Sequence, residues 1–200
     1  MGDGRITTSL KFYIMLKIFE IPKNAGNFAR FLNASFIGNK SIDVVIIRQP
    51  YERFWSATKT IVNEISIFGS FPFESEVNMR TTYTGLNFSV EEVISKSLSM
   101  LDQSNLYVHL KPQIEFIGDK KFDEVIYFEN LNTEIENLIE KYSITTIENF
   151  SLDRKLTVSP KERDNEAMEY ILNTPLVKSK LDDFYSLDSM IYNNPSSLLK

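Results

Sequence analysis

The chain has 200 residues, 42% of them hydrophobic and 24% charged, a composition that suffices for a buried core and excludes a disordered chain. Its formal net charge of -5 argues against binding to nucleic acid through phosphate neutralisation. It has no cysteine and one histidine, which excludes disulfides, thiolate metal sites, cysteine nucleophiles and multi-histidine metal centres. The length predicts a single domain over residues 1–200.

Membrane and export signals are not recognisable in the sequence. The most apolar region is interrupted by charged residues before it reaches the roughly 18 apolar residues of a membrane span. Residues 1–9 are short and polar, unlike a secretory signal. We therefore expect a cytoplasmic protein without a membrane partner.

Two strand–helix pairs are predicted in the first third of the chain. Residues 11–21 are rich in β-branched and aromatic side chains and predict a strand, which ends because Pro22 cannot donate to a ladder. Apolar residues at helical spacing predict a helix over 28–34. The continuous apolar run 43–47 predicts a second strand, buried on both faces, and a helix over 51–62 follows it.

The rest of the chain continues this alternation after one long excursion. Residues 69–88 lack clear periodicity and contain Gly and Pro, so we expect them to form a functional loop on the substrate side. Ser89 and the acidic residues after it start a helix that runs to about residue 101. The remaining predicted elements are a strand over 123–128 and helices over 132–142, 161–172 and 176–185. Strands that alternate with helices predict a three-layer α/β fold, with a central parallel sheet flanked by helices.

Two predicted strand ends carry groups that suit an anion. Pro22–Asn27 follows the first strand and opens a helix, where backbone amides and the helix dipole favour a phosphate and Lys23 adds positive charge. Arg48 ends the second strand, at the edge where ligands bind in open α/β sheets, and Ser56 lies one to two turns into the next helix. Taken alone, these segments also fit an ordinary turn and a solvated helix start, and we expect Arg53 on the helix surface in a structural role.

Taken together, the two segments resemble one family, the membrane-type carbohydrate sulfotransferases that act on heparan- or chondroitin-like chains. Residues 21–28 (IPKNAGNF) are similar to the 5′-phosphosulfate loop of that family, and residues 45–57 (VIIRQPYERFWSA) are similar to its 3′-phosphate element. Three further segments resemble family elements in the same order: residues 109–113 (HLKPQ), 127–131 (YFENL) and 184–192 (FYSLDSMIY). The resemblance therefore covers nearly the whole chain.

The resemblance implies a P-loop-like α/β fold that binds 3′-phosphoadenosine 5′-phosphosulfate (PAPS) and transfers its sulfuryl group to an acceptor hydroxyl, leaving PAP. The acceptor would be a saccharide or another small molecule, and no metal is expected. The cofactor core would span about residues 11–145, followed by a helical segment over about 160–192. The residues implied to hold the 5′-phosphosulfate are Pro22, Lys23, Asn24, Ala25, Gly26, Asn27 and Phe28. Those implied to hold the 3′-phosphate are Arg48 and Ser56, and Arg154 and Lys155 either fold over the cofactor or form a solvated loop.

Two residues are implied to take part in the transfer itself. Negative charge builds on the bridging oxygen as the sulfuryl group leaves, so Lys23 and backbone donors aimed at that oxygen lower the barrier. The acceptor hydroxyl must lose a proton, and His109 is the candidate base because its ordinary pKa lies near neutrality. A packed structural histidine is the alternative. In that case Glu129 is the first substitute as base, or else a partner of Lys23 or of a loop amide, and Glu74 and Glu76 are weaker candidates.

Two other functions stay open at this point. Asn27 and Phe28 stand where the family carries hydroxyl side chains, so the chain could be a degenerate nucleotide-binding or interaction module without turnover. A P-loop-type small-molecule kinase is the other alternative, although the Lys-Ser/Thr pair of a Walker loop and an acidic magnesium site are not evident.

Overall fold

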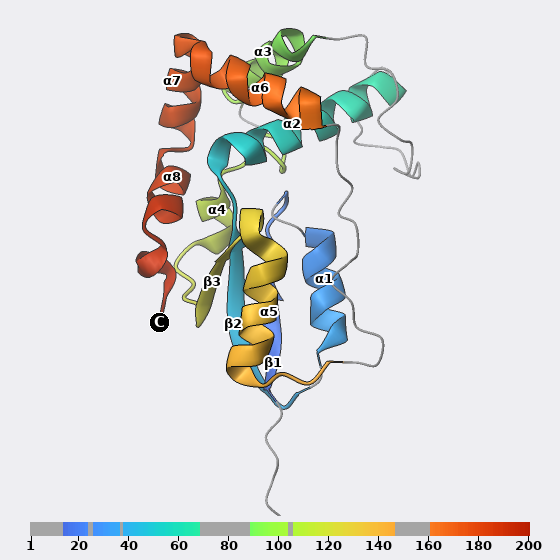
Figure 1. Ribbon diagram of the computed structural model, residues 1–200. Coiled ribbons are helices and arrows are strands. Elements are labelled where there is room, and N and C mark those ends of the chain that lie inside the picture. Colours follow the sequence, from blue (N-terminus) through green and yellow to red (C-terminus); the bar gives the residue numbers. More distant parts are fainter. Residues whose placement is uncertain (1–13, 24–25, 37, 69–88, 104–105, 147–160) are drawn as a thin grey trace, which may run out of the picture.

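A parallel β-sheet forms the centre of the computed structural model (Figure 1), which describes residues 14–23, 26–36, 38–68, 89–103, 106–146 and 161–200. Its strands in the described part of the chain are β1 (Ile14–Phe19), β2 (Lys40–Ile47) and β3 (Glu124–Tyr127), with β2 in the middle. Both pairings are parallel, and the register places Val44 opposite Ile18 on one side and Glu124 on the other. The last four residues of β2 are fully buried, as a central strand covered on both faces requires.

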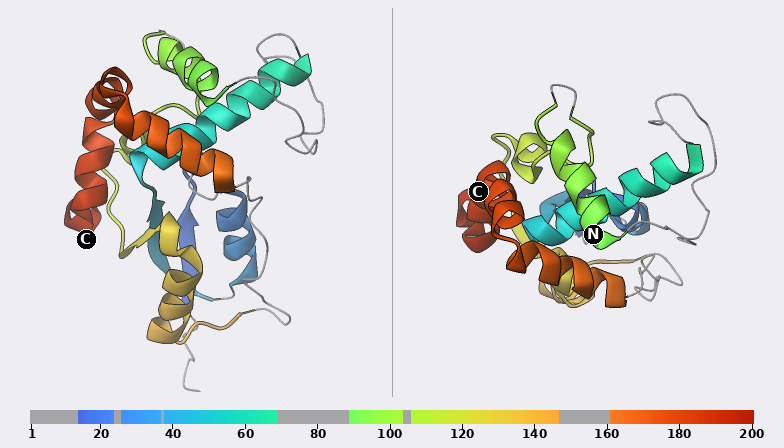
Figure 2. Two further views of the ribbon diagram at one scale, coloured as in Figure 1. Left: turned by 45° about the horizontal axis from the view of Figure 1, so that its top comes forward. Right: turned by 90° about the horizontal axis from the view of Figure 1, so that it is seen from above.

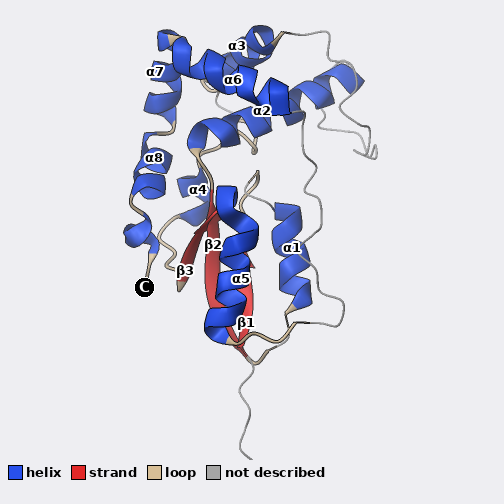
Figure 3. Ribbon diagram, viewed as in Figure 1, coloured by secondary structure: helices blue, strands red, loops and turns tan. Residues whose placement is uncertain are grey.

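Helices cover both faces of this sheet (Figure 3), so the chain has a mixed α/β fold with a parallel sheet between helical layers. One face packs against α1 (Gly26–Ser35) and α5 (Leu131–Tyr142), which contribute Leu32 and Ile135 to a core with Val44 and Ile46. The other face packs against α4 (Gln113–Ile117), α8 (Ser186–Asn193) and the 3-10 turn η2 (Pro195–Leu198). Val45 and Ile47 are buried on that side, so the alternation of side chains along β2 supplies both cores.

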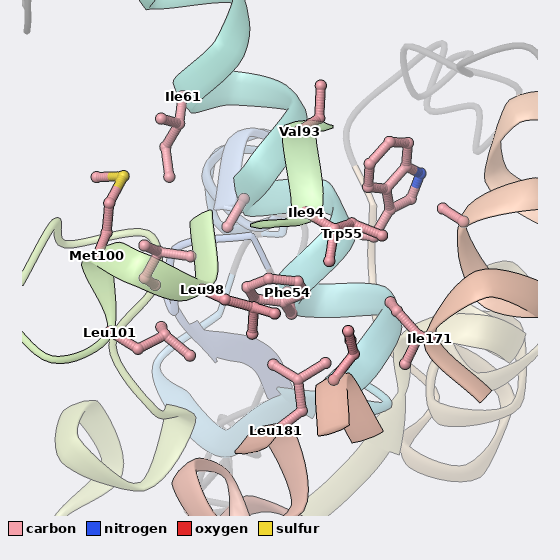
Figure 4. Packing of buried hydrophobic residues seen from close by; sticks show 14 of the residues in the cluster. Phe54, Trp55, Ile61, Val93, Ile94, Leu98, Met100, Leu101, Ile171 and Leu181 are labelled. Carbon is pink, nitrogen blue, oxygen red and sulfur yellow. The ribbon is translucent and has the colours of Figure 1, made fainter. Parts of the chain in front are cut away.

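A second group of helices lies beyond the carboxyl ends of the strands (Figure 2). It consists of α2 (Pro50–Phe68), α3 (Val90–Met100), α6 (Lys161–Asn173) and α7 (Pro175–Phe184). Figure 4 shows their common core, a cluster to which α2 contributes Phe54 and Ile61, α3 Ile94, α6 Ile171 and α7 Leu181. Helix α2 begins three residues after the end of β2 and therefore lies next to the edge where the strands end. Its packing in this helical core holds it there.

The strands and most helices confirm the sequence prediction. The start of α3 has the predicted cap, because the Ser89 side chain accepts from the Glu92 amide at 3.1 Å and the Glu92 carboxylate accepts from the Ser89 amide at 2.7 Å. Helix α2 continues to Phe68, beyond the predicted end. The short helix α4 was not predicted, since it has too few residues for a clear periodicity. Helix α8 lies within the helical segment expected over about 160–192, but its own bounds were not predicted. None of the helices that the structure describes is long and apolar enough to cross a membrane.

Candidate functional site

The three strands end at one edge of the sheet and bring separate parts of the sequence together. Pro22 and Lys23 follow β1, Arg48 follows β2, and the 3-10 turn η1 (Phe128–Asn130) follows β3. Parallel strands place their carboxyl ends on the same side, where open α/β sheets bind ligands. Two of the sequence-predicted cations, Lys23 and Arg48, therefore reach this edge from segments 25 residues apart.

Arg48 is held against the other two strand ends. Its Nη1 donates to the Lys23 carbonyl at 3.2 Å, and its guanidinium carbon lies 4.2 Å from the centre of the Phe128 ring. Among the described residues its ion-pair partner is Glu52, whose Oε2 lies 3.8 Å from Nε, too long for a hydrogen bond. Burial lowers the pKa of Arg48, and the negative charges of Glu52 and Glu129 only partly oppose that effect. The Arg48 cation is therefore largely desolvated and incompletely neutralised.

Lys23 has an unusual backbone conformation, with φ of 66° in the left-handed region that non-glycine residues seldom adopt. Such strain concentrates at ligand-binding sites. The Lys23 ammonium donates to the Thr60 hydroxyl on α2, and that hydroxyl donates to the Ser56 carbonyl at 3.3 Å. Lys23, Arg48 and the face of α2 that carries Ser56 thus belong to one connected group.

The remaining sequence-predicted cofactor residues are placed only in part. Gly26, Asn27 and Phe28 form the first turn of α1, directly after the loop that contains Lys23, and the side chains of Asn27 and Phe28 lie outside what the structure describes. Four further candidates lie outside the described residues altogether: Asn24, Ala25, Arg154 and Lys155. The same holds for Glu74 and Glu76 and for the whole predicted excursion over 69–88.

His109 lies in a turn before α4, in an environment that disfavours its protonation. Its Nδ1 is buried without a hydrogen-bond partner among the described residues, and its ring meets the Tyr107 ring edge-on at 5.0 Å between centroids. Burial, and then the positive charges of Lys23 and Arg53, lower the pKa of His109 to about 4. In the folded chain the pKa of His109 therefore lies well below its ordinary value near neutrality, and the imidazole is neutral at pH 7.

Glu129 connects the end of β3 to the start of α2. Its Oε1 accepts from the Gln49 backbone amide at 2.9 Å. Of the structural roles considered for Glu129, the structure therefore shows the one in which it binds a loop amide. Burial and the Glu129 charge raise the pKa of Tyr192 to about 12, which places the phenol of α8 beside the same carboxylate.

The expectation that Arg53 lies on the helix surface is wrong. Its side chain is 0% exposed, and Nε, Nη1 and Nη2 have no hydrogen-bond partner in the part of the chain that the structure describes. The helical spacing of buried Pro50, Phe54 and Ala57 could have revealed this, because position 53 falls on the same stripe. Arg53 is therefore a buried guanidinium whose charge acts on His109, and its residue type gave no indication of this burial.

Two further polar residues at the site were missed. Gln113 and Asp188 are both fully buried, and both bond to the backbone around the end of β2 and the start of α4. Gln113 lies in segment 109–113 and Asp188 in segment 184–192, both of which resemble family elements. The resemblance did not imply a role for either side chain.

Comparison with known proteins adds no relative to this picture. No family model matches the chain, and neither a curated protein nor a solved structure matches it.

Proposed function

We propose that the chain is a PAPS-dependent sulfotransferase that moves a sulfuryl group to a hydroxyl of a saccharide or another small molecule. The observation that carries the proposal is the contact between Arg48 and the Lys23 carbonyl. It joins the two segments whose sequences resemble the 3′-phosphate and 5′-phosphosulfate elements of one family. A nucleotide that carries phosphates at its 3′ and 5′ positions needs cations close to each other in space, one for each phosphate.

The local architecture supports the same ligand. A strand, a loop containing Lys23 and the amino end of α1 follow one another, as in a P-loop-like fold, and the helix dipole there favours an anion. In the proposal, Lys23 and the backbone of residues 24–28 hold the 5′-phosphosulfate, and Arg48 and Ser56 hold the 3′-phosphate. The incomplete neutralisation of Arg48 supports this role, because an anionic ligand would supply the missing charge.

The proposed reaction needs one proton acceptor, one cation and no redox partner. The acceptor oxygen bonds to sulfur while the bond between sulfur and the 5′-phosphate oxygen breaks, and the hydroxyl proton passes to His109. Lys23 stabilises the charge that develops on the departing phosphate oxygen. His109 suits the role of base because it is neutral at pH 7 and lies within electrostatic range of Lys23. Its low pKa makes it a weak base, so the rate depends on its position beside the acceptor. Arg154 and Lys155 remain candidates for closing over the nucleotide.

Thermal unfolding with different nucleotides tests the proposal. A ligand that binds only the native state raises the Tm according to its concentration relative to Kd. We expect PAP to raise the Tm and ATP with magnesium to raise it less, and we expect PAPS to yield PAP when a suitable acceptor is present. A larger rise with ATP and magnesium would instead indicate a kinase. Stabilisation by PAP without transfer to any acceptor of a broad hydroxyl panel would indicate a binding module.

A further inference from the structure

The backbone of Arg48 is clamped by a side chain from a distant segment. The Gln113 Oε1 accepts from the Arg48 amide at 2.9 Å, and the Gln113 Nε2 donates to the Arg48 carbonyl at 2.8 Å. Arg48 is the first residue beyond β2, so its amide and carbonyl have left the strand ladder and need other partners. Gln113 supplies both with one fully buried amide group.

Gln113 is itself fixed by a residue of the C-terminal helix α8. The two carboxylate oxygens of Asp188 accept from the Gln113 amide at 2.7 Å and from the Ile114 amide at 2.9 Å. The residue before α4, Pro112, makes no side-chain cap bond, so Asp188 satisfies the free amides of that helix from outside. Asp188 is 0% exposed, which keeps water from replacing these bonds.

These contacts form a chain of hydrogen bonds from α8 to the end of β2. Asp188 is 140 positions from Arg48 in the sequence, yet a single residue, Gln113, separates them in the chain of bonds. On the far side, the guanidinium of Arg48 meets the Lys23 carbonyl and the Phe128 ring. Both the backbone and the side chain of Arg48 are therefore held, by elements that the sheet alone does not provide.

We propose that Gln113 and Asp188 are positioning residues for Arg48, and that through them α8 sets the preference of the site for nucleotides that carry a 3′-phosphate. This inference rests on the proposed function, in which Arg48 holds that phosphate. A guanidinium recognises a phosphate through hydrogen bonds of fixed direction, so a small displacement of its backbone weakens binding even though the charge remains.

The test compares two nucleotides that differ only at the 3′ position. Calorimetry gives the Kd of PAP and of 5′-AMP for the wild-type chain, Gln113→Leu and Asp188→Asn. We expect Gln113→Leu to weaken PAP roughly tenfold or more, as for one lost hydrogen bond to a charged group, and to change the Kd of 5′-AMP less than about twofold. Asp188→Asn keeps one acceptor oxygen and should have a smaller effect in the same direction.

Matched substitutions at exposed positions serve as controls. Gln103→Leu and Asp183→Asn make the same chemical changes on the surface and should leave both Kd values unchanged. A role in stability alone would lower the Tm of Gln113→Leu but keep the ratio of the two Kd values. If Gln113→Leu does not fold, the ratio in Asp188→Asn decides.

The outcomes separate the two proposals. If the wild-type chain binds 5′-AMP as tightly as PAP, the proposed function fails and the inference fails with it. If the wild-type chain prefers PAP and the folded variants keep that preference in full, the inference alone is overturned. A selective loss of PAP binding in the variants supports both.

Discussion

Two charged clusters lie at different ends of the same sheet, and they differ in burial and in charge balance. At the amino end of β3, Lys200 contacts Asp43 at 3.0 Å and Asp123 at 2.9 Å, and all three side chains are partly open to solvent. At the carboxyl end, Arg53 is fully buried without a hydrogen-bond partner among the described residues, and the mostly buried Arg48 has its Glu52 carboxylate 3.8 Å away. Exposed ion pairs form at little cost, whereas buried unpaired cations are costly to the fold. The cluster at the carboxyl end is therefore the one that stability does not explain and that a binding function would explain.

The largest difference between the two clusters should appear in turnover. His109→Ala removes the proposed base at the carboxyl end, and we expect the rate of sulfuryl transfer to fall by about 100- to 10,000-fold. The affinity for PAP should stay within a few fold, because the imidazole is not assigned to the nucleotide. A transfer assay with saturating PAPS measures the first and calorimetry the second. Lys200→Ala, at the amino end, should keep its turnover, and normal turnover in His109→Ala would pass the role of base to Glu129.

The next effect concerns nucleotide affinity. Arg48→Ala removes a charge-assisted contact worth about 1.5 to 3 kcal/mol, which corresponds to a loss of one to two orders of magnitude in PAP affinity. Arg30→Ala is the matched control, because Arg30 lies on the exposed face of α1 and pairs with Glu20 at 2.7 Å. Equal PAP affinity of Arg48→Ala and the wild-type chain in calorimetry would refute the site.

The third effect is on proton binding and is measurable without a ligand. The chain has one histidine, so the NMR titration of its imidazole reports His109 alone, with an expected pKa of about 4. Arg53→Met removes one of the charges that lower this pKa and should move it toward 6.5. It should also raise the free energy of unfolding, because a buried unpaired cation is replaced by an apolar chain of similar length. An unchanged titration would show that Arg53 does not act on the imidazole.

The same histidine gives the sign of one pH dependence. Its pKa is lower in the folded chain than the ordinary value of 6.5, so between these values the unfolded chain binds more protons. Stability should therefore fall as the pH decreases from about 6.5 to about 4. Urea unfolding at several pH values measures this, and the slope should become shallower in His109→Gln, which cannot take up the proton.

The smallest effect belongs to the exposed cluster. The hydrogen bond from Lys200 is the main cause that lowers the pKa of Asp123, so this pair stabilises the fold above the ordinary carboxyl pKa and loses its effect as the pH falls through the lowered value. Lys200→Ala should decrease the Tm only slightly at pH 7, and the decrease should vanish in strong acid. A large decrease of the Tm at pH 7 would show that the exposed cluster stabilises the fold strongly, against the expected difference between exposed and buried charges.

The sequence by itself determined the elements whose signals are local. The apolar run of β2, the cap at Ser89 and the helical spacing in α5, α6 and α7 depend on residues within a few positions of one another, and the structure confirms these elements. The position of Lys23 and Arg48 at strand ends also followed from local pattern. The parallel arrangement of the strands then brought the two residues to one edge of the sheet, where Arg48 contacts the Lys23 carbonyl.

Only the tertiary structure decided the environment of the individual polar groups. The burial of Arg53, the low pKa of His109 and the clamp on Arg48 depend on groups that arrive from other helices and loops. The Gln113 amide reaches Arg48 across 65 positions, and Asp188 reaches Gln113 across 75. Periodicity extends over one or two turns, whereas hydrogen bonding and desolvation depend on distance in space. For that reason the sequence predicted that Lys23 and Arg48 lie at strand ends, and the folded chain determined how Arg48 is held there and which other polar groups surround it.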